Sequence, residues 1–444
     1  MAKEMGTRLE ECYLLLQTLP IIKKECDMMQ SSFLNPEPDA IKNWVPTREA
    51  AKKRLNDFIP RAGVAYAKRR NFVLGPEQHA NVSALSPWIR HRVILEEDVL
   101  RKVLKIHNVS SAEKFIQEVF WRGYFKGWLE HRPEVWRRYK KNVMSYVDQL
   151  ENNAVLARRY ETAINAKTGI DCFDAWASEL IKTGYLHNHA RMWFASIWIY
   201  TLELPWELGA DFFYRHLLDG DPASNTCSWR WVCGLHTIGK TYLARASNIE
   251  QFTQSRFNPE GQLALNAPSM SEPPLTEIIA PNFKSAELIG RRYGLLITEE
   301  DISIDSLGLS NRSAAIMALG SVTARSVLPL SSRVEDFAPA LVKDGATRIE
   351  KFYDMPCSIS TEVDWHKAIN EWAKEYSLDC IVTPRLMIGP VRTRLQKAVM
   401  ELNIPLVEIS RTYDRVVTQY TKRGFFGLKK KIPNILLELD IAKG

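Results

Sequence analysis

The chain has 444 residues, a formal net charge of +7, 45% hydrophobic residues and 25% charged residues. This length exceeds the ~100–200 residues of a typical domain, so we expect more than one domain, each with a substantial core. No segment approaches the ~18 consecutive apolar residues of a membrane-spanning helix, and Met1 to Arg8 lacks a secretory signal pattern. We therefore expect a cytoplasmic, monomeric protein without a membrane segment.

Cysteine and histidine spacing argues against a metal site. The 7 cysteines include no CxxC pair, and His187 and His189 lack the i, i+4 spacing of helical zinc ligands. Neither a disulfide framework nor a bound metal is expected. Most of the 13 tryptophans lie between Trp44 and Trp231. Indoles at this density suit stacking on flat aromatic ligands, although a large helical core would also use them.

The first half of the chain is predicted to be helical. Residues 1–40 are expected to form a helical extension, and residues 41–255 a mostly helical domain. Within this domain, aromatic residues follow helical spacing over residues 112–130. Two further helical patterns in residues 168–203 are separated near Gly184, and glycine commonly ends helices. The predicted fold class of this half is therefore all-α.

The C-terminal part has a different pattern. Prolines interrupt residues 256–285, which predicts a linker before a second domain over residues 286–444. Strands that alternate with helices predict that this second domain is an α/β Rossmann-like domain with a parallel sheet. It contains no GxGxxG and no Walker phosphate loop. The predicted strands are residues 294–298, 379–383 and 405–409, and the predicted helices are residues 365–376 and 391–402.

One helix face in the first domain carries an unusual mixture of side chains. Glu118, Trp121 and Arg122 fall at i, i+3 and i+4, so they share one face. A carboxylate, an indole and a guanidinium on one stripe suit a cavity that stacks a base and hydrogen-bonds its edge. The alternative is an ordinary helix whose charged residues lie at the solvent margin.

Two later segments place polar groups near helix starts. Asn188, Arg191 and Met192 share one helix face. Asp219 and Asp221 flank a glycine, which predicts a tight turn that presents both carboxylates. Such polar groups are more often hydrogen-bonding partners of a helix end than site residues. An aspartate paired with Arg191 is the simplest arrangement, because Gly-Asp-Pro lacks the ligand count of a calcium loop.

Together, these segments resemble the FAD-binding domain of the photolyase/cryptochrome family. Residues 82–90, 115–122, 168–192 and 218–231 are similar, in order and separation, to its phosphate-contacting segment, pocket helix, flavin-clamping stretch and flavin-edge loop. The similarity covers about residues 41–260. It implies FAD bound between helices, in an enzyme that uses light to split cyclobutane pyrimidine dimers in DNA.

The resemblance also assigns roles to particular residues. It implies an ion pair between Arg191 and Asp219 beside the isoalloxazine, and it implies that Trp121 and Trp231 stack on a dimer flipped out of the duplex. Glu118 would hydrogen-bond a pyrimidine edge. The implied FAD contacts are Ser83, Leu85, Ser86, Asn188, Arg191, Asp219, Asp221 and Asn225. The implied catalytic and lesion-pocket residues are Glu118, Trp121, Arg122, Met192, Asn225 and Trp231.

An electron relay and a DNA contact are implied as well. Trp206 and Trp229 match two members of the family's tryptophan relay; the third tryptophan is absent, and Tyr160 could substitute for it. Contacts to the DNA backbone are expected from basic residues after the pocket helix, although such a run is equally typical of a solvated helix face. These residues are Arg132, Arg137, Arg138, Lys140 and Lys141.

The order of the domains differs from the family, whose antenna domain precedes the FAD domain. Faint similarity to antenna-domain pieces in residues 295–301, 365–376, 389–392 and 424–431 leads to the hypothesis of a circular permutation. An unrelated Rossmann-like appendage is the alternative. The sequence does not identify a second, antenna chromophore. Two functional alternatives also stay open: a cryptochrome-like blue-light photoreceptor with the same FAD site, and a family-derived protein that has lost its flavin.

Overall fold

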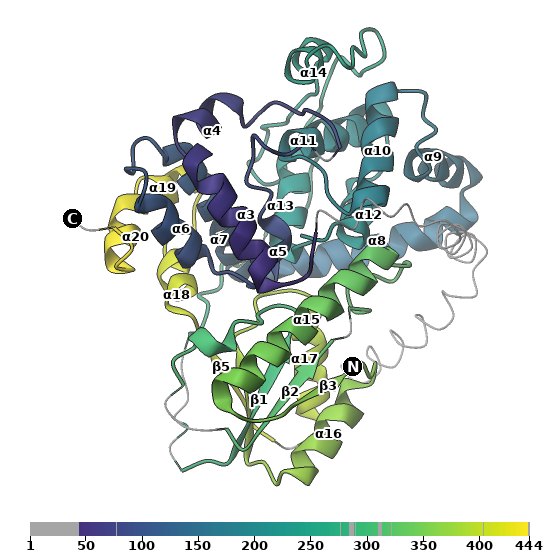
Figure 1. Ribbon diagram of the computed structural model, residues 1–444. Helices are drawn as coiled ribbons and strands as arrows, with labels where there is room; N and C mark the ends of the chain where they lie inside the picture. The colour runs from purple at the N-terminus through teal and green to yellow at the C-terminus, as the bar shows by residue number, and fades with distance from the viewer. Residues whose placement is uncertain are drawn as a thin grey trace.

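The computed structural model describes residues 44–442 apart from positions 77, 276, 284–287, 289, 310–312, 321 and 403. A helical region lies above an α/β region in Figure 1. The extension expected over residues 1–40 lies outside the described residues. Among the helices that are described, none combines the length and the apolar character needed to cross a bilayer.

The helical region packs a core rich in indoles. Trp88, Trp176, Trp193, Trp198 and Trp229 are among the largest fully buried side chains, so much of the tryptophan content fills the core. The helices are α3 (Arg48–Phe58), α4 (Val64–Arg69), α5 (Ser86–Arg90), α6 (Glu96–Leu104), α7 (Glu113–Glu130), α8 (Pro133–Asn152), α9 (Ala154–Ile164), α10 (Asp171–Thr183), α11 (Asn188–Ser196), α12 (Trp206–His216), α13 (Pro222–Val232) and α14 (Ala246–Phe252), with short helical turns η2 (Ile59–Arg61) and η3 (Ile197–Thr201).

The break predicted near Gly184 is confirmed. Gly184 ends α10 with a left-handed φ of 68°, a conformation that glycine adopts without steric cost. A Cβ atom at this position would also come within 2.7 Å of Leu218 Cγ. The glycine therefore both ends the helix and lets it approach the segment between α12 and α13, in which Asp219 and Asp221 lie.

The α/β region contains a five-stranded parallel sheet in the order β3-β2-β1-β4-β5. The strands are β1 (Tyr293–Thr298), β2 (Ala315–Leu319), β3 (Cys357–Ser360), β4 (Cys380–Pro384) and β5 (Leu406–Ile409). The predicted fold class is confirmed: a helical region is followed by an α/β region with a parallel sheet. The circular permutation stays a prediction, because many unrelated domains share a doubly wound sheet.

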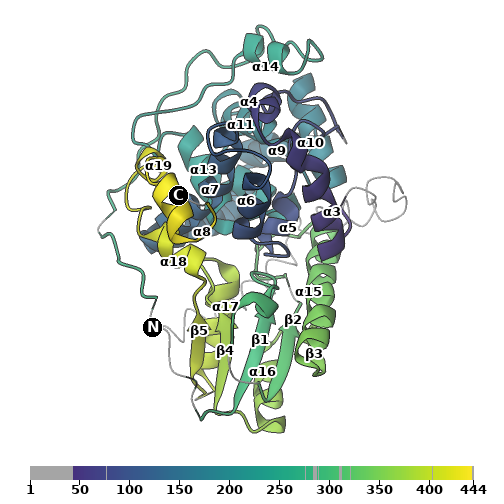
Figure 2. The same ribbon diagram turned by 60° about the vertical axis from the view of Figure 1, so that its left-hand side comes forward.

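Both faces of the sheet are covered by helices (Figure 2). Successive side chains of β1 point to opposite faces. Leu295 and Ile297 pack with α15 (Ser332–Tyr353) in a core that continues into the helical region. Leu296 packs in a separate core with α16 (Trp365–Glu375) and α17 (Pro390–Met400). A short turn, η4 (Ile304–Ser306), follows β1.

The last helices leave the sheet and return to the helical region, where they lie beside α6 and α7 (Figures 1 and 2). They are α18 (Thr412–Thr418), α19 (Phe425–Lys429) and α20 (Ile432–Glu438). Glycines on α7 permit this close packing, since a Cβ on Gly127 would be 2.5 Å from Thr421 Oγ1. The C-terminal segment therefore contacts the helix on which the sequence places the pocket residues.

Candidate functional site

The segment Leu217–Pro222, here called the carboxylate loop, presents two buried aspartates between α12 and α13. Asp221 caps α13, and its Oδ1 accepts a hydrogen bond from the Ser224 amide at 2.8 Å. Asp219 Oδ2 pairs with Arg191 Nη2 at 2.8 Å. Residues from two helix starts that are separated along the chain thus meet at one point, as the sequence led us to expect.

Asp221 is held by cations from α7. Its Oδ2 lies 3.3 Å from Arg122 Nη1 and 3.2 Å from Lys126 Nζ. Burial opposes the charge on Asp221, but Lys126, Arg122 and Arg90 outweigh burial and lower its pKa. Lys126 is a site residue that the sequence reasoning missed, although it follows Arg122 by one turn on the same helix face. Asp221 therefore serves as an ionised anchor of the loop.

One carboxylate oxygen of Asp219 has unused hydrogen-bonding capacity. Its Oδ1 is buried without a hydrogen-bond partner among the residues that the structure describes. A buried polar atom left unpaired costs ~1–3 kcal/mol, so such an atom points to a bound group or water. One turn after Asp221, Asn225 is buried and donates from Nδ2 to the Ala210 carbonyl at 2.7 Å. A ligand with N–H or hydroxyl donors, such as the flavin and ribityl parts of FAD, fits this acceptor.

The residues expected to contact the FAD phosphates lie where α5 begins. Leu85 is buried, and Ser86 is the first residue of α5. The Ser83 carbonyl accepts a hydrogen bond from Arg54 Nε at 2.8 Å. Between them, Ala84 has a left-handed φ of 47°, which an L-residue rarely adopts. Asn188 is the first residue of α11 and is exposed.

The predicted polar face of α7 contacts several different neighbours. Glu118 Oε1 pairs with Arg70 Nη1 at 2.5 Å, and burial raises the pKa of Glu118 against the opposing effect of Arg70. Arg122 Nε lies 3.0 Å from Glu96 Oε1, in addition to its contact with Asp221. Arg70 was missed by the sequence reasoning, since nothing local relates α4 to α7.

The indoles expected to stack on bases have aromatic partners within the chain. Trp121 is stacked on Phe425 of α19, with ring centroids 3.7 Å apart and an interplanar angle of 11°. Trp231 is stacked on Tyr242 at 5.5 Å and 29°. Both indoles are half-buried. One face of Trp121 is therefore taken by the C-terminal segment, a contact for which the sequence gives no signal.

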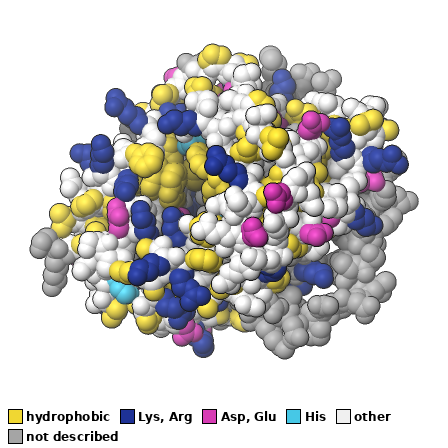
Figure 3. All heavy atoms as spheres, turned by 90° about the horizontal axis from the view of Figure 1, so that it is seen from above, with side chains coloured by type: hydrophobic (Ala, Val, Ile, Leu, Met, Phe, Trp, Pro, Cys, Tyr) yellow, Lys and Arg dark blue, Asp and Glu magenta, His cyan; other side chains and the backbone are white. Residues whose placement is uncertain are grey.

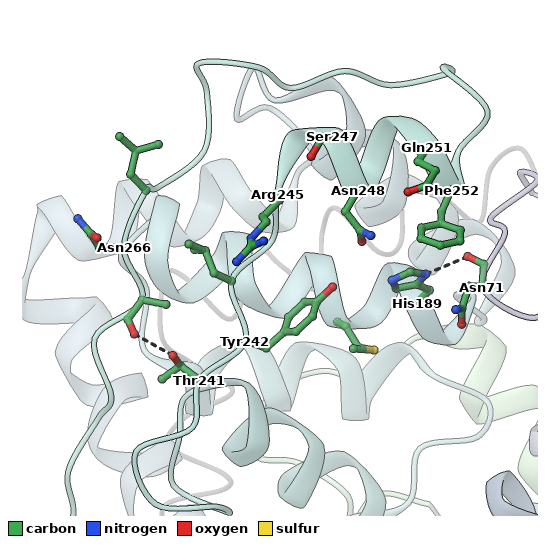
Figure 4. Close-up of a pocket in the computed structure, with 14 residues that line it drawn as sticks. Asn71, His189, Thr241, Tyr242, Arg245, Ser247, Asn248, Gln251, Phe252 and Asn266 are labelled. Atoms are coloured by element: carbon green, nitrogen blue, oxygen red, sulfur yellow. Dashed lines mark hydrogen bonds between the residues drawn. The ribbon is translucent and has the colours of Figure 1, made fainter. Parts of the chain in front are cut away.

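Met192 lines a cavity of about 780 Å³ on the side of α11 that faces α14 (Figure 4). Tyr242, Arg245 and Asn248 also line it, and His189 accompanies them with its Nδ1 2.9 Å from the Asn71 carbonyl. The other expected lesion-pocket residues are not part of this lining. From above, the helical region has a hollow lined by hydrophobic side chains, with Lys and Arg around it (Figure 3).

The aromatic neighbours of the two relay tryptophans differ. Trp206 is stacked on Tyr139, with ring centroids 5.8 Å apart. Trp229 meets Trp198 edge-on at 6.2 Å, and Trp198 meets Tyr160 at 6.1 Å. Trp198 was not among the residues that the sequence singled out. It places Tyr160, the expected substitute for the missing relay member, one ring away from Trp229.

Two residues of the basic run after α7, Arg132 and Arg138, are less available than expected. Arg132 is 9% exposed and donates to the Lys422 carbonyl at 2.7 Å. Arg138 Nε pairs with Glu134 Oε1 at 3.0 Å. The expectation that both contact DNA phosphates is wrong for Arg132, because the returning C-terminal segment covers it. For Arg138 it is weakened by the ion pair.

Residues 115–293 match the family model described as the FAD binding domain of DNA photolyase. The mitochondrial deoxyribodipyrimidine photo-lyase of Saccharomyces cerevisiae is 30% identical over 245 residues, which cover 50% of this chain and 41% of that protein. The deoxyribodipyrimidine photo-lyase of one Thermus thermophilus strain is 30% identical over 217 residues, 49% of each chain. The crystal structure of a class III photolyase from Agrobacterium tumefaciens is 25% identical in sequence to this chain. The similarity covers 50% of this chain and 46% of that chain, with a TM-score of 0.40.

The chain thus spans less than half of the length of these curated relatives. The matched range runs from α7 to the start of β1 and includes Glu118, Arg191 and the carboxylate loop. This chain is therefore similar to the FAD binding domain of DNA photolyase over residues 115–293, and to deoxyribodipyrimidine photo-lyases over about half of its length.

Proposed function

We propose that the helical region binds FAD with the isoalloxazine beside Arg191 and Asp219. The observation that carries this proposal is the ion pair of 2.8 Å in which Asp219 keeps a buried, unpartnered oxygen. Arg191 orients the carboxylate through this ion pair, so that its second oxygen is ready to accept a hydrogen bond from the ligand. Asp221 and Asn225, which follow Asp219 along the chain, are proposed to contact the flavin as well, and Ser83, Leu85 and Ser86 are proposed to face the phosphates.

We further propose that the protein repairs DNA by splitting cyclobutane pyrimidine dimers. Bound in its reduced state, FAD would supply the electron on excitation by light. The protein would hold the extruded dimer between Met192 and the free surfaces of Trp121 and Trp231, and Glu118 would hydrogen-bond its edge. The names of the curated relatives support this activity, and the hollow with surrounding Lys and Arg in Figure 3 supports a polyanionic substrate.

A light-dependent repair assay tests both parts. Purified protein with FAD and reductant is mixed with an oligonucleotide that carries one thymine cyclobutane dimer, and blue light is given or withheld. We expect dimer loss only in the lit sample. Glu118→Ala should weaken repair and leave flavin absorbance unchanged. Equal repair by this variant would contradict the pocket assignment, and absence of flavin from the wild-type protein would contradict the FAD site.

A blue-light photoreceptor with the same FAD site is the second candidate. The observation that favours it is that Phe425 covers one face of Trp121 and that Arg70 pairs with Glu118. Two groups assigned to the lesion thus already have partners in the chain. Bound and reduced flavin without any dimer loss, together with a light-dependent change in hydrogen exchange of α19, would support this function over repair.

A further inference from the structure

Consecutive carboxylates follow β1 at the carboxyl end of the sheet. Glu299, Glu300 and Asp301, here called the acidic triplet, are 2%, 7% and 2% exposed. Buried carboxylates persist only with partners, and each of these has an arginine from another element. Glu299 pairs with Arg325 at 2.5 Å, and Glu300 pairs with Arg90 at 2.6 Å. Asp301 pairs with Arg411 at 2.6 Å.

Arg90 connects the triplet to the carboxylate loop. Its Nη2 donates to Glu300 Oε1 at 2.6 Å, and its Nε donates to the Gly220 carbonyl, also at 2.6 Å. Gly220 lies between Asp219 and Asp221. Burial opposes the charge on Arg90, but Glu300 and Glu299 outweigh burial and raise its pKa. A fully buried guanidinium that remains charged therefore fixes the backbone between the two aspartates.

Two more contacts join the same edge of the sheet to this loop. His91 Nδ1 lies 2.7 Å from the Glu299 carbonyl, and its Nε2 lies 3.4 Å from the Leu218 carbonyl. Burial lowers the pKa of His91 to about 3, so the ring is neutral at physiological pH. Between β4 and α17, a Cβ on Gly389 would come within 2.8 Å of Pro222 Cγ. The α/β region thus approaches the loop directly at Pro222, and it is linked to Gly220 and Leu218 through Arg90 and His91 of the helical region.

In doubly wound sheets, the carboxyl ends of the strands where the order reverses usually form a ligand crevice. Here the reversal lies between β1 and β4, and this edge is packed against the carboxylate loop. We infer that Glu300 is a positioning residue: through Arg90 it fixes the Gly220 carbonyl and thereby aims the free oxygen of Asp219 at the ligand. This inference rests on the proposed FAD site and makes the α/β region part of its support.

Glu300→Gln tests the inference, with Asp301→Asn as the matched control. Asp301 is the adjacent buried carboxylate, and its partners Arg411 and Arg92 lie outside the carboxylate loop. Both full-length variants should lose stability to urea. We expect the FAD dissociation constant to rise about tenfold in Glu300→Gln and to stay within about twofold in Asp301→Asn. Glu300→Asp keeps the charge but shortens the reach, so its dissociation constant should lie between those of wild type and Glu300→Gln.

Hydrogen exchange in flavin-free protein supplies a readout that does not need the cofactor. The Ser224 amide donates to Asp221 at 2.8 Å and reports on the order of the loop. Its exchange should be faster in Glu300→Gln than in Asp301→Asn at equal global stability. The inference is overturned if the two variants match in exchange and in FAD affinity. If wild type does not bind FAD, the proposed function fails, whereas the exchange comparison still decides the role of Glu300.

Discussion

Buried carboxylates occur in both regions of the molecule, but their surroundings differ. In the helical region, Asp219 has one arginine partner and an oxygen with no hydrogen-bond partner among the described residues. In the α/β region, Asp301 receives hydrogen bonds at 2.6 and 2.7 Å from Arg411, on both of its oxygens. Burial of a carboxylate is therefore no sign of a site by itself. What distinguishes Asp219 is the oxygen that no described donor or cation contacts, whereas a carboxylate with both oxygens bonded, as in Asp301, joins parts of the protein.

The largest expected effect lies in the saturated region. Arg411→Met should lower the free energy of unfolding by about 3–5 kcal/mol, because Asp301 keeps its burial but loses its main partner. Urea unfolding measures this loss. Under conditions in which the variant is folded, its FAD affinity should equal that of wild type. If FAD affinity fell together with stability, the proposed difference between Asp301 as a structural carboxylate and Asp219 as a ligand-binding carboxylate would be wrong.

Acid should weaken the same region. Burial opposes the charge on Glu299, but Arg325 and Arg90 outweigh burial and lower its pKa from 4.5 to about 2. A lowered pKa of an acid stabilises the folded state above the unfolded pKa, so this contribution, roughly 3 kcal/mol, is lost as pH falls from about 4.5 toward 2. In Glu299→Gln, the unfolding free energy should be lower at neutral pH and change less over that interval. If the unfolding free energies of wild type and Glu299→Gln changed with pH to the same extent, the stabilising role given to ionised Glu299 would be wrong.

In the helical region the effect should appear in binding rather than in stability. Asp219→Asn removes the charge that holds Arg191, which is 23% exposed and can be solvated. We expect about tenfold weaker FAD binding with a loss of unfolding free energy near ~1 kcal/mol. Asp57→Asn is the control, since Asp57 is 60% exposed and pairs only with Lys53 among its described contacts. Unchanged FAD affinity in Asp219→Asn would count against the flavin site.

The smallest effect should come from the contact between the C-terminal segment and α7. Phe425→Leu loses the stacking on Trp121 and should cost about 1 kcal/mol of unfolding free energy. Phe426→Leu, at a neighbouring side chain that is 76% exposed, should cost almost nothing. A double-mutant cycle with Trp121→Leu isolates the coupling between the rings. A coupling energy of zero would mean that the stacked pair does not hold α19 in place.

Elements with a strong local pattern were predicted, and those that depend on partners were not. The helix over residues 112–130 and strand β1 were placed to within one residue, because their periodicity and buried run are local. Strand β2 was missed, since Ala315–Leu319 is a short run without clear strand preference and becomes a strand by pairing with β1. Strand β3 was missed because it is a short edge strand with exposed side chains.

The sequence by itself determined the helical and α/β classes, the end of α10 at Gly184 and the meeting of Arg191 with the carboxylate loop. The two classes and the helix end follow from periodicity and backbone conformation, whereas the pairing of Arg191 with Asp219 was implied by the family resemblance. Only the tertiary structure decided that Phe425 stacks on Trp121 and that Glu300 pairs with Arg90, 210 positions away. Packing brings such residues together. Because nothing in the local sequence depends on the distant partner, no pattern within either segment predicts the contact.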